Sequence, residues 1–126
     1  MGAKRRGRDE KREERITNEI IVDAYGPEEQ AMGWYYYLEN ELRFPFKATC
    51  IRRREVSPLT VKDEVEVMGM PSEDECEREV FVSIRWGKGK LAVPLAQLKP
   101  AKGTDAKTRK AIEDWHYWVG MGYQFG

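Results

Sequence analysis

Residues 80–86 carry the pattern that restricts the fold most strongly, because apolar side chains occupy every second position. Val80, Val82, Ile84 and Trp86 alternate with Phe81, Ser83 and Arg85. This two-residue period is that of a β-strand with one buried face. The residues that follow, Gly87-Lys88-Gly89, predict a tight hairpin turn into a second strand at residues 91–95. The chain must therefore contain antiparallel sheet.

Further strands and two helices are predicted around this hairpin. Residues 46–56 and 59–68 are strand-like, and residues 97–100 add a short strand or turn. Pro27 and the acids after it favour the start of a helix over residues 27–42, whose apolar stripe is Ala31, Trp34, Tyr35, Leu38 and Leu42. A cap at Thr104-Asp105 predicts a second helix to about residue 119, with Ala111, Ile112, Trp115, Trp118 and Val119 on one face.

These elements predict an α+β fold. We expect a small bent antiparallel sheet or an SH3-like barrel, packed with one helix from the N-terminal half of the chain and one C-terminal helix. The length of 126 residues allows one compact domain. We place that domain at residues 16–126 and interpret residues 1–15 as a flexible basic arm without core residues.

The overall charge balance conceals a strong segregation of charge. The chain has 22 basic and 22 acidic residues, yet residues 1–15 hold seven Lys or Arg against four acids. Residues 63–79 hold eight acids and one base, Arg78. The negative charge is therefore concentrated in one short stretch.

The acidic loop at residues 71–79 is the most informative chemical feature. A hard cation such as Ca²⁺ takes six to eight oxygen ligands, which carboxylates gathered on a loop can supply. The loop lacks the ordered Asp and Gly pattern of an EF-hand, so a site here has to combine separate segments. We select Asp74, Glu75 and Glu77 on the loop and Glu39, Asn40 and Glu41 on the first helix as candidate ligands. The alternative is a solvated hairpin tip beside ordinary surface acids of a helix.

Other reactive residues give no catalytic constellation. His116 is the single histidine and has no identifiable nucleophile or base partner, and Cys50 and Cys76 lie in different segments. We therefore expect no enzymatic activity. The N-terminus lacks a secretory signal and no apolar run is long enough to span a membrane, so we expect a cytoplasmic protein. In that compartment both thiols should be free.

Aromatic and basic residues leave a second function open. The groups at residues 34–37 and 115–118 could stack bases, and Arg52, Arg53 and Arg54 with the basic arm could neutralise phosphates. Because most of these aromatic residues fall on the apolar stripes of the two helices, we expect them in the core. Nucleic acid stays a secondary partner, and a protein partner is a further alternative.

Several motifs together resemble one known family. They are residues 33–39, Phe44-Pro45-Phe46, Ser57-Pro58-Leu59, Glu75-Cys76-Glu77, residues 91–98 and residues 112–118. In this order they are similar to the CcbP-type calcium-binding proteins of cyanobacteria, over about residues 18–120. The resemblance implies a protein that binds Ca²⁺ without an EF-hand and acts as a cytosolic calcium buffer or sensor, as the family does in controlling free calcium during heterocyst development.

Overall fold

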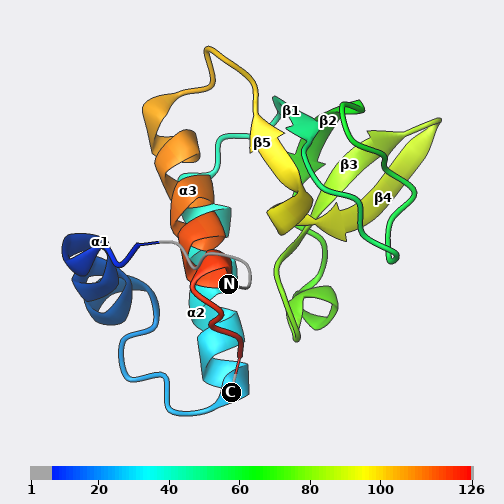
Figure 1. Cartoon of the computed structure of the whole chain (residues 1–126). Coiled ribbons are helices and arrows are strands. Elements are labelled where there is room, and N and C mark those ends of the chain that lie inside the picture. The colour runs from blue at the N-terminus through cyan, green and yellow to red at the C-terminus, as the bar shows by residue number, and fades with distance from the viewer. Residues whose placement is uncertain (1–6, 126) are drawn as a thin grey trace, which may run out of the picture.

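The computed structural model describes residues 7–125, in which helices form one layer and a sheet the other (Figure 1). The helices are α1 (Glu10–Arg15), α2 (Pro27–Glu41) and α3 (Ala106–Gly120). The strands are β1 (Phe46–Cys50), β2 (Glu64–Gly69), β3 (Phe81–Trp86), β4 (Gly89–Pro94) and β5 (Leu98–Pro100). Short turns of helix are η1 (Ile16–Ile20), η2 (Glu73–Cys76) and η3 (Leu95–Gln97). The α+β prediction is confirmed.

The sheet is antiparallel throughout, with the strand order β4-β3-β2-β1-β5. Within residues 7–125, β4 and β5 each pair with a single neighbour, so the sheet is open. Of our two alternatives, the bent sheet is therefore the correct one, and the SH3-like barrel is not formed. The hairpin is as predicted: Trp86 pairs with Gly89, and Gly87 takes the positive φ of +57° that this turn requires.

Strands β1 and β2 are shorter than the sequence predicts. Residues 51–63 form a loop, since local hydrogen bonds replace those of a strand. The Ser57 hydroxyl oxygen accepts from the Leu59 amide at 3.1 Å, and the Asp63 carboxylate accepts from the Thr60 amide at 2.8 Å. Pro58 adds to the effect because it has no amide proton to donate.

The core lies between the two layers, where the aromatic side chains of α2 and α3 meet. Trp34 is fully buried, with its ring centroid 5.0 Å from that of Trp115 and 5.6 Å from that of Trp118. The prediction that the aromatic groups of the helices belong mainly to the core is confirmed. Tyr36 is the clear exception, because about half of its side chain is exposed.

The N-terminal segment differs from the flexible arm that we expected. Residues 1–6 lie outside the described residues, but residues 10–15 form α1. Arg15 makes two hydrogen bonds to the fully buried Asp114 carboxylate on α3, at 2.8 and 2.5 Å, and Arg12 approaches the same carboxylate at 3.2 Å. The Tyr37 hydroxyl donates to it at 2.6 Å. A sequence count of charges could not reveal this attachment, because it does not show that Asp114 is buried or that α1 lies beside it.

Helix α2 and η1 approach each other closely at Gly33. A Cβ atom at this position would lie 2.4 Å from the carbonyl oxygen of Ile20. Ile16 and Ile20 are buried, so η1 cannot move away without exposing them. The absence of a side chain at Gly33 therefore allows η1 to pack on α2.

We expect Gly33→Ala to lower the free energy of unfolding by about 1–3 kcal/mol, because the contact is with backbone. Alanine is otherwise the better helix former by about 1 kcal/mol, so helix propensity alone predicts the opposite sign. Chemical denaturation measures the change. Gly69→Ala is the control, since no heavy atom lies within 4 Å of a Cβ there. A stabilised Gly33→Ala variant would show that η1 moves freely.

Candidate metal centre

Two contacts, at the start and in the middle of the acidic loop, help to attach it to the rest of the fold. Cys76 is buried and its sulfur accepts a hydrogen bond from the Phe81 amide at 3.4 Å. The Tyr35 hydroxyl on α2 donates to the carbonyl oxygen of Pro71 at 2.5 Å. Helix α2 and the turn η2 are therefore held side by side, and Glu73 and Asp74, between these attachments, line a groove against the helix.

A groove of about 520 Å³ lies between the first turns of α2 and η2. Four carboxylate residues line it, and we call it the acidic groove: Glu28 from α2, and Glu73, Asp74 and Glu77 from the loop. Arg78 is the single cation among the described lining residues. The groove therefore gathers negative charge from two separate segments.

The pKa values of two tyrosines beside this groove are raised by its surroundings. Burial raises the pKa of Tyr35, and the nearby Glu39 carboxylate raises that pKa further. The pKa of Tyr36 is raised chiefly because its hydroxyl donates to Glu73. Charges from α2 and from η2 thus act on the same pair of hydroxyl groups.

The structure distributes our six candidate ligands over several places. Asp74 and Glu77 line the acidic groove. Glu39 and Asn40 line a neighbouring hollow, together with Gly33 and Tyr36. Glu41 lies instead 3.8 Å from Lys107 at the start of α3, and Glu75 is exposed outside the described lining of the groove.

Sequence reasoning omitted two residues of the groove, Glu28 and Glu73. Glu28 was interpreted only as a helix-start acid, although it stands seven residues before Tyr35 and therefore shares its helix face. Glu73 belongs to the acidic loop but was not selected. The spacing between Glu28 and Tyr35 was the signal available in the sequence.

Neighbouring charges reduce the set of available donors. Glu79 accepts two hydrogen bonds from Arg54, at 3.1 and 2.5 Å, so it forms a closed pair outside the groove. Burial raises the pKa of the Cys76 thiol to about 11, which keeps it protonated at neutral pH. The metal ligands that remain in the groove are carboxylate oxygen atoms, which a hard cation prefers.

The carboxylates line the groove without forming a finished coordination sphere. Across residues 7–125, no three side chains of Asp, Glu, His or Cys lie close enough together to hold a metal ion. A cation would therefore have to draw these side chains inward. Exposed acidic side chains can make such rotamer changes at small cost.

Comparison with known proteins places this α+β fold in a family. A family model described as calcium binding, that of CcbP, matches residues 14–119. The chain belongs to the CcbP calcium-binding family. The crystal structure of Anabaena CcbP is 40% identical, with a TM-score of 0.81 over 94% of this chain and 96% of that chain. A second structure, described as a calcium-binding protein in the calcium-binding form, is 41% identical, with a TM-score of 0.80 over 92% of this chain and 94% of that chain.

Two further findings complete the comparison. A search of curated proteins gives no significant match. Among the described helices, none combines the length and the apolar character needed to cross a membrane. The CcbP family membership therefore stands on the family match and the two solved structures, and it confirms the resemblance noted in the sequence.

Proposed function

We propose that this CcbP-family protein binds Ca²⁺ in the acidic groove. The observation that carries the proposal is that Glu28 on α2 lines the same groove as Glu73, Asp74 and Glu77 on the loop. Carboxylates from two elements that are held together can surround a cation, whereas a solvated hairpin tip cannot. We assign the protein no catalytic role.

The candidate ligands that do not line the acidic groove have a secondary role in this proposal. Glu39 adds negative potential beside the groove, because it raises the pKa of both Tyr35 and Tyr36. Asn40, Glu41 and Glu75 stay second choices as ligands, and Glu41 would first have to leave Lys107. Asp74 and Glu77 are the two original candidates that we place first.

The chemistry of the groove favours Ca²⁺ over Mg²⁺. Calcium accepts six to eight oxygen ligands in flexible geometry, and water can complete its shell in an open groove. Magnesium requires a nearly ideal octahedron at shorter distances, which carboxylates spread over a helix and a loop do not provide. A bound dication would also relieve the repulsion between the carboxylates.

The Tyr36 hydroxyl on α2 can change its hydrogen bond when an ion binds to Glu73. It donates to Glu73, so an ion that takes both oxygens of this carboxylate would compete with the hydroxyl. The side chain of Tyr36 is half exposed and can turn away. This competition supports a sensor role alongside simple buffering.

We also propose that residues 16–126 act as one calcium-binding unit in the cytoplasm. A single cluster of buried residues runs from Ile16 to Trp118, and the family match covers nearly the same range. Cys50 and Cys76 are free and buried, as suits a reducing compartment. Fractionation of the native cells tests the location.

Calcium should stabilise the fold. At 100 times the dissociation constant, a ligand that binds only the folded state adds about 2.7 kcal/mol, which corresponds to a rise in Tm of roughly 10 °C for a chain of this size. Thermal melts and calorimetric titration with Ca²⁺ and then Mg²⁺ measure the effect. Unchanged melting in millimolar Ca²⁺ would contradict the proposal.

A triple variant locates the site. Glu73→Gln with Asp74→Asn and Glu77→Gln should abolish the calcium-dependent rise in Tm, since the amides keep the shape but lose the charge. The matched control, Glu14→Gln with Glu55→Gln and Glu64→Gln, removes three exposed acids that do not line the groove. Equal loss of binding in both variants would indicate a general charge effect rather than this site.

Hydrogen exchange separates a sensor from a buffer. A sensor should show slower amide exchange in η2 and the first turn of α2 when Ca²⁺ is bound, while a buffer would take up the ion with little change there. Tyr36→Phe should weaken the link between the two elements without removing the ion. The comparison uses the full chain in both states.

A further inference from the structure

A second cavity, on another part of the surface, has the opposite charge. It has a volume of about 370 Å³ and is lined by residues of β5, of the loop that follows it, and of α3, with Ile51 beyond the end of β1. Three exposed cations line it: Lys99, Lys102 and Arg109. We call it the basic cavity.

Within residues 7–125, no acid neutralises the cations of the basic cavity. Among the described residues, Lys99, Lys102 and Arg109 make no ion pair with a carboxylate. Glu113 is the one acid among the lining residues that the structure describes, and its carboxylate lies 3.7 Å from the guanidinium of Arg12 on α1. Positive potential therefore remains available to a ligand from outside.

Between these cations the lining is apolar. It includes the buried side chain of Ile112, with Pro100 and Ala101 beside it. Ile51 contributes an exposed aliphatic side chain, of which 42% is accessible. A hydrophobic residue of a partner could be covered here, while acidic neighbours on either side met the cations.

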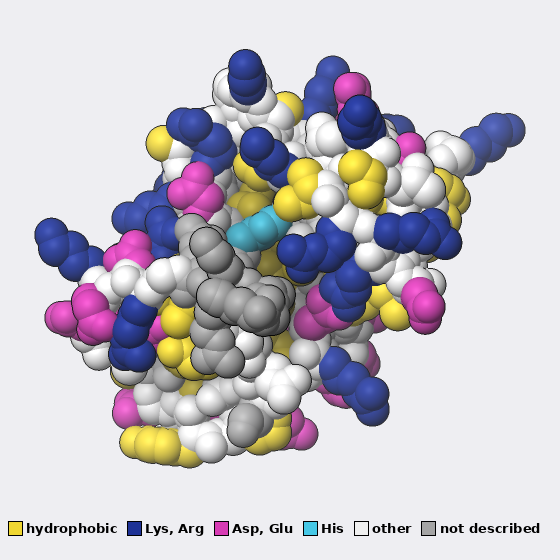
Figure 2. Space-filling model, viewed as in Figure 1, with side chains coloured by type: hydrophobic (Ala, Val, Ile, Leu, Met, Phe, Trp, Pro, Cys, Tyr) yellow, Lys and Arg dark blue, Asp and Glu magenta, His cyan; other side chains and the backbone are white. Residues whose placement is uncertain are grey.

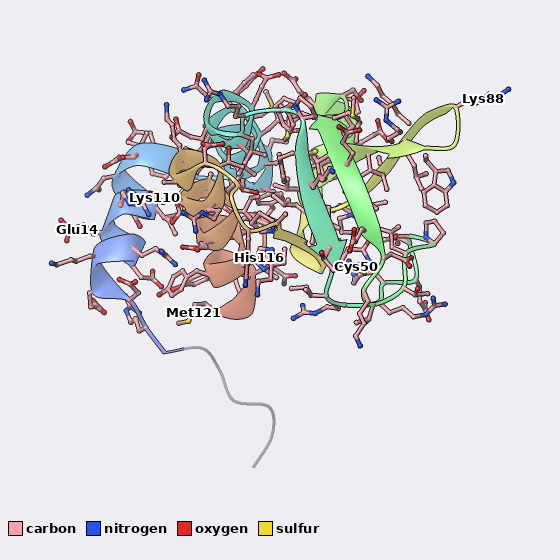
Figure 3. The ribbon with its side chains drawn as sticks, turned by 90° about the horizontal axis from the view of Figure 1, so that it is seen from above. Glu14, Cys50, Lys88, Lys110, His116 and Met121 are labelled. Atoms are coloured by element: carbon pink, nitrogen blue, oxygen red, sulfur yellow. The ribbon has the colours of Figure 1, made fainter. Side chains whose placement is uncertain are left out.

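The face around this cavity agrees with that description. Figure 2 shows Lys and Arg side chains on several sides of the histidine, with hydrophobic side chains directly beside it. That histidine is His116, which also lines the cavity. Figure 3 shows Lys88 at the tip of the β3–β4 hairpin, on the far side of the sheet from His116.

We propose that the basic cavity docks an acidic peptide segment of a partner protein, with one apolar side chain of that segment inserted between Lys99, Lys102 and Arg109. Among its described lining residues there is no Phe, Tyr or Trp and His116 supplies the one aromatic ring, so it lacks the row of rings on which successive bases of a single strand stack. The aliphatic lining also exceeds what a free phosphate needs. An acidic segment with an apolar anchor satisfies both parts of the lining.

Fluorescence anisotropy tests this proposal in calcium-free buffer with a chelator. The probe is a short fluorescein-labelled peptide with one leucine between glutamates and aspartates, and a second peptide carries serine in place of leucine. We expect the leucine peptide to bind and the serine peptide to bind more weakly. Because Ca²⁺ is absent, the result is independent of the acidic groove.

Charge reversal locates the binding. Lys99→Glu with Lys102→Glu and Arg109→Glu should raise the dissociation constant of the leucine peptide by at least about tenfold at physiological salt. The matched control, Lys62→Glu with Lys88→Glu and Lys90→Glu, makes the same change of net charge on exposed lysines outside the cavity. If the triple variant does not fold, as judged by circular dichroism, Lys102→Glu alone is compared with Lys88→Glu.

The apolar lining is tested separately. Ile51→Ser should weaken the binding of the leucine peptide but not that of the serine peptide. The control Val56→Ser changes another exposed aliphatic residue and should affect the binding of neither peptide. Four results would overturn the proposal. They are no peptide binding at millimolar concentration, an equal loss of peptide affinity in the two charge-reversal variants, tighter binding of a single-stranded oligonucleotide than of the peptide, and full displacement of the peptide by inorganic triphosphate.

Discussion

Asp114→Asn should lower the free energy of unfolding by about 3–5 kcal/mol, the loss typical when one partner of a buried ion pair is removed. The Asp114 carboxylate is fully buried and receives hydrogen bonds from Arg15 on α1 and Tyr37 on α2. An amide has the same shape but cannot balance the guanidinium charge. Urea denaturation followed by circular dichroism measures the loss, which is a large part of the 5–15 kcal/mol that stabilises an ordinary domain.

The neighbouring residue supplies the control. Glu113 also faces Arg12, at 3.7 Å, but 59% of its side chain is exposed. Pairs of that kind contribute about 0–1 kcal/mol, so Glu113→Gln should be nearly neutral. Arg15→Ala should loosen the attachment of α1 and leave α2 and α3 in place, because Arg12 still contacts Asp114. Equal stability of the Asp114→Asn and Glu113→Gln variants would show that the buried network contributes nothing.

Trp34→Ala should cost about 3–5 kcal/mol, because the indole is fully buried and its removal leaves a large cavity. Its ring makes an edge contact with Trp115 and packs near Trp118, so the variant also removes the aromatic contacts between α2 and α3. Loss of the near-ultraviolet circular dichroism signal should accompany the change. Stability comes from thermal or chemical denaturation.

Trp86 is the matched control for that variant. It belongs to β3, and 46% of its side chain is exposed. Trp86→Ala removes the same group from the surface and should cost about 1 kcal/mol or less. Similar losses at both positions would contradict the assignment of Trp34 to the centre of the core.

Local patterns were sufficient to predict most of the fold. Both long helices and the β3–β4 hairpin follow from the spacing of apolar residues, from Pro27 and from Gly87. The loop at residues 51–63 was missed because its turn-forming hydrogen bonds compete with a strand that the composition favours. Asp9 and the Glu, Lys and Arg residues after it allow a short helix, but the stable attachment of α1 was not predicted, because it depends on tertiary contacts with Asp114.

The candidate site was predictable only in part. The acidic loop could be inferred from charge, and the need for a second segment from the absence of an EF-hand pattern; Asp74 and Glu77 do line the groove. The spacing of Glu28 and Tyr35 places them on one helix face, but the sequence does not show that the loop packs against this face, so Glu28 was not chosen. Glu28 lines the groove, and Glu41, near the other end of the same helix, faces Lys107.

The two outer strands of the sheet also affect how these molecules behave at high concentration. A free strand edge can pair with another chain and start aggregation. β5 has only three residues and ends at Pro100, which has no amide proton to donate. β4 carries the exposed Lys90 near its start and ends at Pro94. Short strands, proline and lysine are the features by which natural sheets prevent such pairing, so we expect the protein to remain dispersed in a crowded cell.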